Sequence, residues 1–167
     1  MPSHPLPSAT DLINHLADQI RPRVSATTVL VGIHSGGVWI AEALHAALAL
    51  ATPLGTLDVS FHRDDHHLGN GLKAGGKASQ LPDVEGAHLI LVDDVLYTGR
   101  TIRAALNEIF DYGRPAKVEL AVLVDRGGRE LPIAASYCPH SLALPASQSL
   151  DLQRDAAGQL SFSLREK

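Results

Sequence analysis

The spacing of apolar residues predicts an amphipathic helix near the start of the chain. Apolar positions from Leu12 to Ile20 recur at helical spacing and would form one face of that helix. Ser8 or Thr10 can cap its first turn, because a hydroxyl oxygen accepts a hydrogen bond from an unpaired backbone N–H group there. Pro22 then ends the helix.

Strands and helices alternate along most of the remaining chain. Apolar and β-branched runs predict strands at residues 28–33, 54–61, 89–93 and 117–124. Alanine-rich or periodic stretches predict helices at residues 38–50 and 101–112. This alternation predicts the α/β class, with a mainly parallel sheet and helices on both of its faces. We expect Trp39, Leu106 and Phe110 to pack in the core.

Two segments depart from the alternation. Residues 62–86 are rich in glycine and poor in apolar side chains, which predicts a flexible lid loop. Residues 149–153 and 160–164 alternate around a turn at 155–158, which predicts a C-terminal hairpin. A length of 167 residues suits one domain with one good core, so we expect a single domain over residues 1–167.

Composition narrows the class of protein. The net charge of −4 argues against a mainly electrostatic nucleic-acid binder. The single cysteine, Cys138, excludes an intrachain disulfide and fits a reducing cytoplasm. Residues 1–10 contain no apolar signal sequence, and no apolar run is long enough to cross a membrane. We therefore expect a cytoplasmic protein with no membrane partner.

Residues 89–101 carry the most chemical information. An apolar run ends at two adjacent carboxylates, Asp93 and Asp94, and a polar turn containing Gly99 leads into a predicted helix. A helix N-terminus offers backbone N–H groups to a phosphate, and open α/β sheets bind ligands at the carboxyl ends of their strands. The segment predicts a phosphorylated substrate whose hydroxyls face two acids. Because neighbouring side chains point to opposite faces of a strand, we expect only one carboxylate to contact those hydroxyls directly.

The same residues resemble a known signature. The run LILVDDVLYTGRT, residues 89–101, is similar to the ribose-phosphate signature of type I phosphoribosyltransferases. The run AVLVDRGGRELPI, residues 121–133, extends the resemblance to one branch, the bifunctional pyrimidine-operon attenuation regulators and uracil phosphoribosyltransferases. The resemblance spans residues 29–137, about two-thirds of the chain.

The resemblance implies phosphoribosyl pyrophosphate (PRPP) as one substrate. It also implies Mg²⁺, held mainly by that substrate, with Asp93 or Asp94 as an available protein ligand. Purine-specific relatives have an aspartate at the position of Tyr97, so a tyrosine there disfavours a purine base. The implied ribose 5-phosphate site comprises Asp93, Asp94, Val95, Leu96, Tyr97, Thr98, Gly99, Arg100 and Thr101.

Three further segments match the family in order. Gly36 stands where many relatives have an arginine in their pyrophosphate loop. Arg63, at the start of the predicted lid, would stabilise charge that develops on pyrophosphate. Arg129 would lie near pyrophosphate, and Asp125, Arg126 and Arg129 would belong to a small hood, residues 125–145, over the base. The implied pyrophosphate loop comprises His34, Ser35, Gly36 and Gly37.

These inferences lead to one main function and two alternatives. The main function is a uracil phosphoribosyltransferase that makes UMP and pyrophosphate from uracil and PRPP. The first alternative is a regulator that binds pyrimidine-operon leader RNA in response to UMP. Residues 13–17 lack the arginine that such regulators carry, and only Arg21 and Arg23 lie nearby, which predicts weak RNA binding. The second alternative is a phosphoribosyltransferase for another base, or a PRPP-binding protein without turnover. We also expect a homodimer or higher oligomer.

Overall fold

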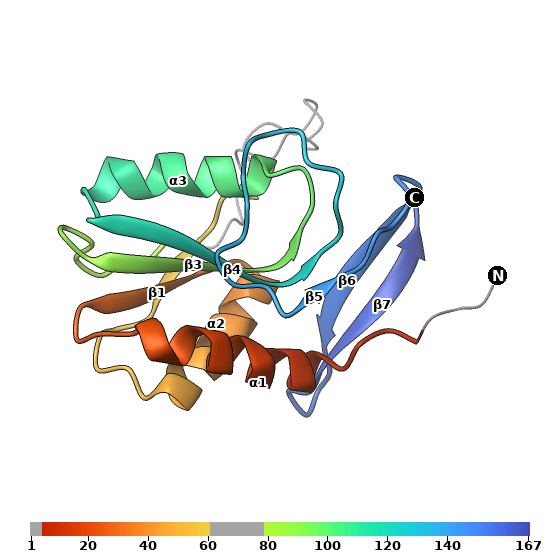
Figure 1. The fold of residues 1–167 in the computed structure, drawn as a ribbon, viewed down its shortest axis with the longest axis horizontal. Coiled ribbons are helices and arrows are strands. Elements are labelled where there is room, and N and C mark those ends of the chain that lie inside the picture. The colour runs from red at the N-terminus through yellow and green to blue at the C-terminus, as the bar shows by residue number, and fades with distance from the viewer. Residues whose placement is uncertain (1–4, 61–78) are drawn as a thin grey trace.

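The computed structural model describes residues 5–60 and 79–167, and in them five strands form one sheet. The strands lie in the order β2-β1-β3-β4-β5 (Figure 1). All neighbouring pairs are parallel, which confirms the predicted mainly parallel sheet. The strands are β1 Thr28–Ile33, β2 Gly55–Leu57, β3 His88–Leu96, β4 Lys117–Asp125 and β5 His140–Ser141.

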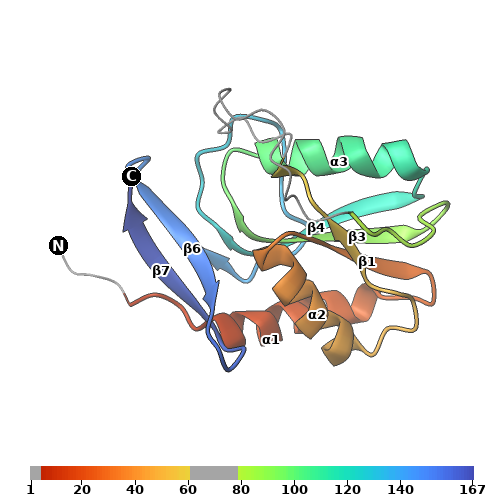
Figure 2. The same ribbon diagram turned by 180° about the vertical axis from the view of Figure 1, so that it is seen from behind.

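Helices cover both faces of this sheet, as the alternation predicts. The helices α1 (Ala9–Ile20) and α2 (Gly36–Leu48) lie on one face, and α3 (Arg100–Tyr112) lies on the other (Figures 1 and 2). Because successive strand residues point to opposite faces, Leu30 packs with α1 and α2, whereas Val31 packs with α3. The two faces therefore form two hydrophobic cores.

The sequence explains why α1 begins and ends where it does. Ser8 is its N-cap, and the Ser8 Oγ accepts a hydrogen bond from the Asp11 N–H at 3.3 Å. The predicted apolar face from Leu12 to Ile20 is buried. Pro22 lies in a short 3₁₀ turn, η1 (Arg21–Arg23), that follows the helix. Within residues 5–60 and 79–167, no helix is both long and apolar enough to cross a membrane.

The second strand is shorter than the sequence predicts. A strand is expected over residues 54–61, but β2 ends at Leu57. Beyond Leu57, backbone N–H groups that a longer strand would use for pairing donate hydrogen bonds to side chains instead. The Asp58 N–H donates to Ser79 Oγ at 3.0 Å, and the Ser60 N–H donates to Asp58 Oδ1 at 2.9 Å. These local hydrogen bonds compete with further strand pairing.

Helix α3 corrects one prediction about the core. The side chain of Phe110 is 53% exposed, so the expectation that it packs in the core is wrong. The buried face of α3 contains Ile102, Ala105 and Ile109. Phe110 comes directly after Ile109 in the sequence, so the turn of the helix points its side chain away from that face. Leu106 is partly buried and packs against the core, as expected.

Strand β3, which carries Asp93 and Asp94, extends past its neighbour β1. Its pairing with β1 ends where Gly32 meets Val92, whereas its pairing with β4 continues to Leu96 opposite Asp125. The strand thus runs three residues beyond the predicted end at residue 93. From Asp93 onward, β1 no longer covers its edge of β3. Asp93 and Asp94 therefore lie within a strand, at a part of its edge with which β1 does not pair.

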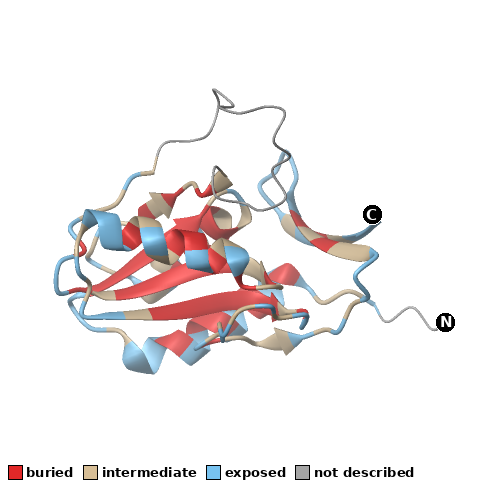
Figure 3. Ribbon diagram, turned by 90° about the horizontal axis from the view of Figure 1, so that it is seen from above, coloured by how far each residue is buried: buried red, intermediate tan, exposed pale blue. Residues whose placement is uncertain are grey.

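The predicted C-terminal hairpin is confirmed. It consists of β6 (Gln148–Arg154) and β7 (Leu160–Glu166), which pair antiparallel. Leu150, Leu152 and Phe162 belong to the core on the α1 side, and Figure 3 shows buried segments in a hairpin whose other residues are half-buried or exposed. Near the hairpin turn, the Arg154 guanidinium lies 4.8 Å from the centre of the Trp39 ring. The hairpin is therefore anchored on the α1 and α2 face.

A buried charged cluster joins β1, β3 and β4 near the ends where these strands start. Glu119 pairs with His88 Nε2, and His88 Nδ1 shares a 3.0 Å hydrogen bond with Thr28 Oγ1. The Tyr137 hydroxyl donates to Glu119 at 3.0 Å, and Lys117 Nζ lies 3.6 Å from Glu119. Burial alone would raise the pKa of Glu119, but His88, Tyr137 and Lys117 outweigh it and hold that pKa below 4.5. Burial and Glu119 raise the pKa of Tyr137 to about 12.

Candidate active site

A pocket of about 530 Å³ lies between the β3–α3 turn and the C-terminal hairpin. Residues from β3, from the turn and from the start of α3 line one side, and they include every residue of the predicted ribose 5-phosphate site. Arg126 and Glu130 come from the segment after β4. A cavity of this size suits a small-molecule ligand. The remaining lining residues are Ser149, Leu150, Asp151 and Lys167.

The two adjacent carboxylates have different surroundings. Asp93 is only 8% exposed, and its Oδ1 accepts a hydrogen bond from the Asp94 N–H at 2.9 Å. Asp94 is half-buried, and its Oδ1 accepts a hydrogen bond from the Val95 N–H at 2.8 Å. The more exposed Asp94 is therefore better placed for direct contact with a ligand. The buried Asp93 is better placed to hold Asp94 in position through the hydrogen bond that it accepts from the Asp94 N–H.

Asp94 also lies against the loop that precedes α2. A Cβ atom on Gly36 would be only 2.5 Å from Asp94 Oδ2, and one on Gly37 would overlap the Val92 carbonyl oxygen. The two glycines thus let this loop approach β3 closely. The predicted pyrophosphate loop, residues 34–37, lies beside Asp94, although it does not line the pocket itself.

The turn after β3 has the features of a phosphate cradle. Gly99 is the N-cap of α3 with a left-handed φ of 95°, and no side chain makes a cap hydrogen bond from that position. Thr98 Oγ1 instead accepts a hydrogen bond from the Arg100 N–H at 3.2 Å. A Cβ atom on Gly99 would lie 3.0 Å from Ile133, so the turn also requires a small residue. The N-terminus of α3 therefore borders the pocket with its positive dipole end.

Arg126 joins this turn to the base of the hairpin. Its side chain is buried, and its guanidinium donates to the carbonyl oxygens of Gln148 at 2.7 Å and Pro145 at 3.0 Å. The guanidinium carbon lies 3.9 Å from the centre of the Tyr97 ring, a cation–π contact. Arg126 Nε and Ser149 Oγ are buried without a hydrogen-bond partner among the described residues.

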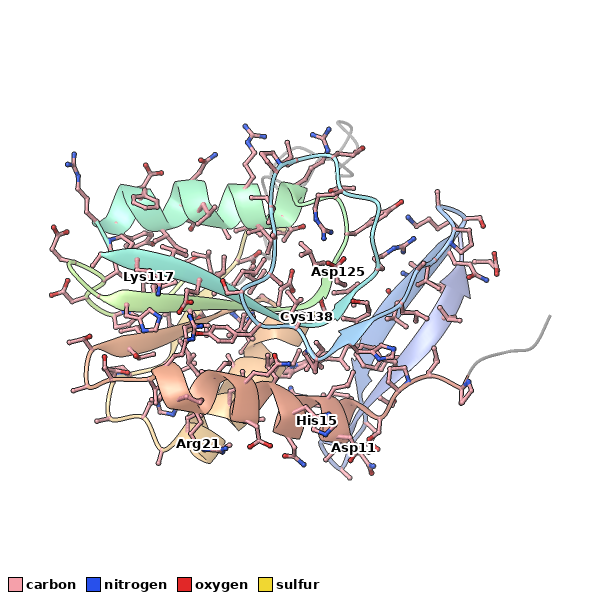
Figure 4. All side chains as sticks on the ribbon, in the orientation of Figure 1. Asp11, His15, Arg21, Lys117, Asp125 and Cys138 are labelled. Atoms are coloured by element: carbon pink, nitrogen blue, oxygen red, sulfur yellow. The ribbon has the colours of Figure 1, made fainter. Side chains whose placement is uncertain are left out.

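Arg129, paired with Asp125, holds the backbone of the turn after β3. Arg129 Nη2 pairs with Asp125 Oδ2 at 2.6 Å, and Arg129 Nη1 donates to the Tyr97 carbonyl oxygen at 2.6 Å. Burial would raise the pKa of Asp125, but hydrogen bonds from Arg129 and the Gly127 N–H outweigh it and lower that pKa. Figure 4 shows Asp125 and Lys117 at opposite ends of β4, so the pocket lies far from the Glu119 cluster. Contact between Arg129 and pyrophosphate stays a prediction.

The acidic residues fit a magnesium ion that is bound mainly through its substrate. In the part of the chain that the structure describes, no three His, Cys, Asp or Glu side chains form a cluster that could hold a metal. Asp93 and Asp94 nevertheless line the pocket. Mg²⁺ typically binds through one or two carboxylates, with substrate phosphates and water as its other ligands. One of these two side chains would suffice.

Some predicted site residues lie outside the described residues, and some residues of the pocket were not predicted. Arg63 and most of the predicted lid fall in residues 61–78, outside the described residues. The end of that loop is described, and there Gln80 pairs with Thr56 through two backbone hydrogen bonds of 2.8 Å. The sequence predicts the hairpin, but nothing in its pattern indicates that its first strand borders the pocket. Glu130 lies in the predicted hood, and the pocket residues that sequence reasoning missed are Ile102, Ser149, Leu150, Asp151 and Lys167.

The fold and the pocket define a class of protein that family comparison identifies. Residues 4–139 match the model of the phosphoribosyl transferase domain, so the chain belongs to the phosphoribosyltransferase family. A hypoxanthine phosphoribosyltransferase from Staphylococcus aureus shares the fold, with a TM-score of 0.68 and 18% identity over 84% of this chain and 78% of that chain. A purine phosphoribosyltransferase from Pyrococcus horikoshii has a TM-score of 0.59 and 24% identity over 79% and 80%.

Curated relatives narrow the similarity further. The bifunctional protein PyrR of Pseudomonas entomophila is 50% identical over 152 residues, and the match covers 88% of each chain. The bifunctional protein PyrR of Pseudomonas paraeruginosa is 52% identical over 152 residues, and the match covers 88% of this chain and 89% of that protein. The similarity thus extends beyond the family match at residue 139 into the C-terminal segment.

Proposed function

We propose that this protein is a uracil phosphoribosyltransferase, which makes UMP and pyrophosphate from uracil and PRPP. The observation that carries the proposal is a single pocket in which Asp93 and Asp94 adjoin the N-terminus of α3. A ribose 5-phosphate needs hydrogen-bond acceptors for its ring hydroxyls and donors for its phosphate, and this pocket offers both. The similarity to bifunctional PyrR proteins supports uracil as the base.

The residues of the pocket contribute mainly by positioning. The turn from Tyr97 to Thr101 would bind the 5′-phosphate through backbone N–H groups at the α3 N-terminus. Asp94 would accept hydrogen bonds from the ribose hydroxyls, and buried Asp93 would orient it. Mg²⁺, bound with PRPP, would neutralise negative charge on the leaving pyrophosphate. Uracil N1 would then bond to the anomeric carbon while the bond from that carbon to pyrophosphate breaks and the N1 proton passes to water, helped by the fixed alignment of the reactants.

A panel of bases tests the proposal. The protein is incubated with PRPP, Mg²⁺ and one base at a time, namely uracil, cytosine, hypoxanthine or guanine, and pyrophosphate release is measured. We expect release with uracil, and none when a chelator removes Mg²⁺. Release with hypoxanthine or guanine at a higher kcat/KM would instead indicate a purine enzyme. Binding of PRPP without release for any base would indicate a protein without turnover.

Regulation through pyrimidine-operon leader RNA is a second candidate, which the resemblance of residues 121–133 to bifunctional attenuation regulators favours. The charges near α1 support it only weakly. Arg21 pairs with Asp18 at 2.5 Å, and Arg23 lies 3.9 Å from Glu119. Figure 4 shows His15 and Arg21 on the side of α1 that faces away from the sheet, so a surface is available, but its cations are partly neutralised. We therefore rank RNA binding below catalysis.

A further inference from the structure

The charged residues that line the pocket carry more negative than positive charge. Its carboxylates are Asp93, Asp94, Glu130 and Asp151, and its cations are Arg100, Arg126 and Lys167. Two of the carboxylates already have a cation beside them. Arg100 Nε lies 3.6 Å from Glu130, and Arg165 Nε lies 3.1 Å from Asp151. A phosphorylated ligand must therefore find positive charge among few side chains.

Lys167 is the cation of this lining that the protein engages least. Arg126 is only 4% exposed, and its guanidinium donates to backbone carbonyl oxygens. Arg100 faces Glu130. Lys167 is exposed and forms no ion pair within the described residues, and its ammonium lies 5.3 Å from the centre of the Tyr97 ring. Its positive charge is therefore available to a ligand.

The backbone of Lys167 is held at the pocket while its side chain can turn. Its N–H donates to the carbonyl oxygen of Ser147 at 2.8 Å, beside the start of β6. The next residue, Gln148, accepts a hydrogen bond of 2.7 Å from Arg126. A lysine side chain is a flexible four-carbon stem that ends in three N–H donors. The ammonium can therefore move from the Tyr97 ring to a ligand while its backbone stays in place.

Phosphate binding at the start of α3 leaves negative charge to be neutralised. A helix N-terminus is equivalent to about half a positive charge, whereas a phosphate monoester carries about −1.5 to −2 at neutral pH. Tyr97 directly precedes Thr98 in the proposed cradle, so an ammonium beside its ring is near this phosphate. A cube of 530 Å³ is roughly 8 Å on a side, about the Debye length at physiological ionic strength. Salt therefore screens only part of the attraction between Lys167 and a phosphate in the pocket.

We infer that Lys167 is a phosphate-binding residue of this site, whose ammonium binds the 5′-phosphate of PRPP and of the nucleotide product. The phosphate would lie between the α3 N-terminus and the hairpin, held by backbone N–H groups from one side and by Lys167 from the other. The inference rests on the proposed function and deepens it, because it adds a distant residue to the predicted ribose 5-phosphate site at residues 93–101. It gives the hairpin a direct part in ligand binding.

Removal of this charge tests the inference with two ligands that differ only in the phosphate. Dissociation constants are measured by calorimetry for UMP and by competition with UMP for uridine. Lys167→Gln should weaken UMP binding about 2- to 30-fold, the range that one charge pair roughly 8 Å apart gives for effective dielectric constants of about 80 to 20. Uridine affinity should stay at the wild-type value. Lys167→Arg keeps the charge and should retain most of the UMP affinity.

A second lysine gives a matched control. Lys117 has a 58% exposed side chain and lies at the end of β4 far from the pocket (Figure 4). Lys117→Gln makes the same change in charge and should leave UMP affinity unchanged. Added NaCl should weaken UMP binding more steeply in the wild type than in Lys167→Gln, because only the wild type has this charge pair to screen. In kinetics, Lys167→Gln should raise the KM for PRPP with little change in kcat, since the phosphate contact is the same before and during the reaction.

The outcomes separate this inference from the proposed function. Wild-type UMP affinity and salt dependence in Lys167→Gln would overturn the inference. Equal losses for UMP and uridine would place Lys167 against the nucleoside instead, and tighter UMP binding would mean that its ammonium occupies the ligand's place; both results would also overturn it. If the wild type binds UMP but turns over no uracil, the proposed function fails, and the comparison of UMP with uridine still tests Lys167. A wild type that binds neither ligand would contradict both.

Discussion

At the scale of single residues, the site depends on two identical side chains that the strand gives different environments. Asp93 is buried and Asp94 is half-buried, although both accept a hydrogen bond from the following backbone N–H. This difference follows from strand geometry, since neighbouring residues face opposite sides. The same substitution should therefore have different effects at Asp93 and at Asp94.

Asp94→Asn should raise the KM for PRPP and lower kcat while the protein stays folded. A hydrogen bond to a charged group contributes about 1.5–3 kcal/mol, so kcat/KM should fall roughly 10- to 150-fold. Steady-state kinetics, with circular dichroism as the folding control, measure this. Unchanged kinetics in both Asp93→Asn and Asp94→Asn would mean that the carboxylates do not bind the ribose.

Gly36→Ala should damage activity without damaging the fold. Alanine has a higher helix propensity than glycine, and Gly36 is the first residue of α2, so the free energy of unfolding should change by less than about 1 kcal/mol. The new Cβ atom would lie 2.5 Å from Asp94 Oδ2 and would displace that carboxylate. We expect a higher KM for PRPP. Wild-type kinetics together with wild-type stability would show that Asp94 tolerates displacement.

At the scale of elements, β1, β3 and β4 are joined at one end by buried charges and form the site at the other. Glu119 is the centre of the buried end, where His88, Tyr137 and Lys117 all favour its ionised form. Because its folded pKa is below its unfolded value, the stability that this carboxylate contributes is present above the unfolded pKa. That stability is lost as the pH falls through the folded pKa.

Glu119→Gln should therefore be less stable than the wild type at neutral pH, and the difference should shrink as the pH falls below 4.5. Urea unfolding across an acidic pH series measures it. Asp83→Asn, at an exposed position, is a suitable control and should show little difference at any pH. A difference that stays constant down to the acid limit would show that shape, rather than charge, matters at this position.

The elements also show where sequence reasoning succeeds and where it fails. The helix α1, the strand β1 and the hairpin follow from local spacing, and the structure confirms them. The end of β2 depends on Ser79, which is distant in the sequence and whose Oγ accepts a hydrogen bond from the Asp58 N–H. The hairpin's place beside the pocket depends on Arg126, whose carbonyl partners are up to 22 residues away. Such contacts leave no periodic pattern, so the sequence does not reveal them.

At the scale of the whole molecule, the net charge of −4 bears on RNA binding. Each phosphate contact adds about 0.9 to the magnitude of the log–log slope of affinity against salt for duplex DNA, which we take as a guide. We expect weak binding to a pyrimidine-operon leader and a shallow slope, measured by filter binding with and without UMP. Arg21→Gln with Arg23→Gln should flatten the slope by about 1.8 if both residues contact phosphates. Nanomolar, UMP-dependent binding with a steep slope would instead make regulation a primary function.

The two cores on opposite faces of the sheet have a consequence for how the chain is made. The core on the α3 side draws its buried residues from Val29 to Val122, so it can close during synthesis on the ribosome. The core on the α1 side includes residues from Ala9 to Phe162, so its first helix is made long before its last partner. Until the hairpin is made, the apolar face of α1 lacks Leu150, Leu152 and Phe162, and an uncovered apolar face is a site of aggregation or chaperone contact. The hairpin that borders the pocket therefore also completes the core on the α1 side.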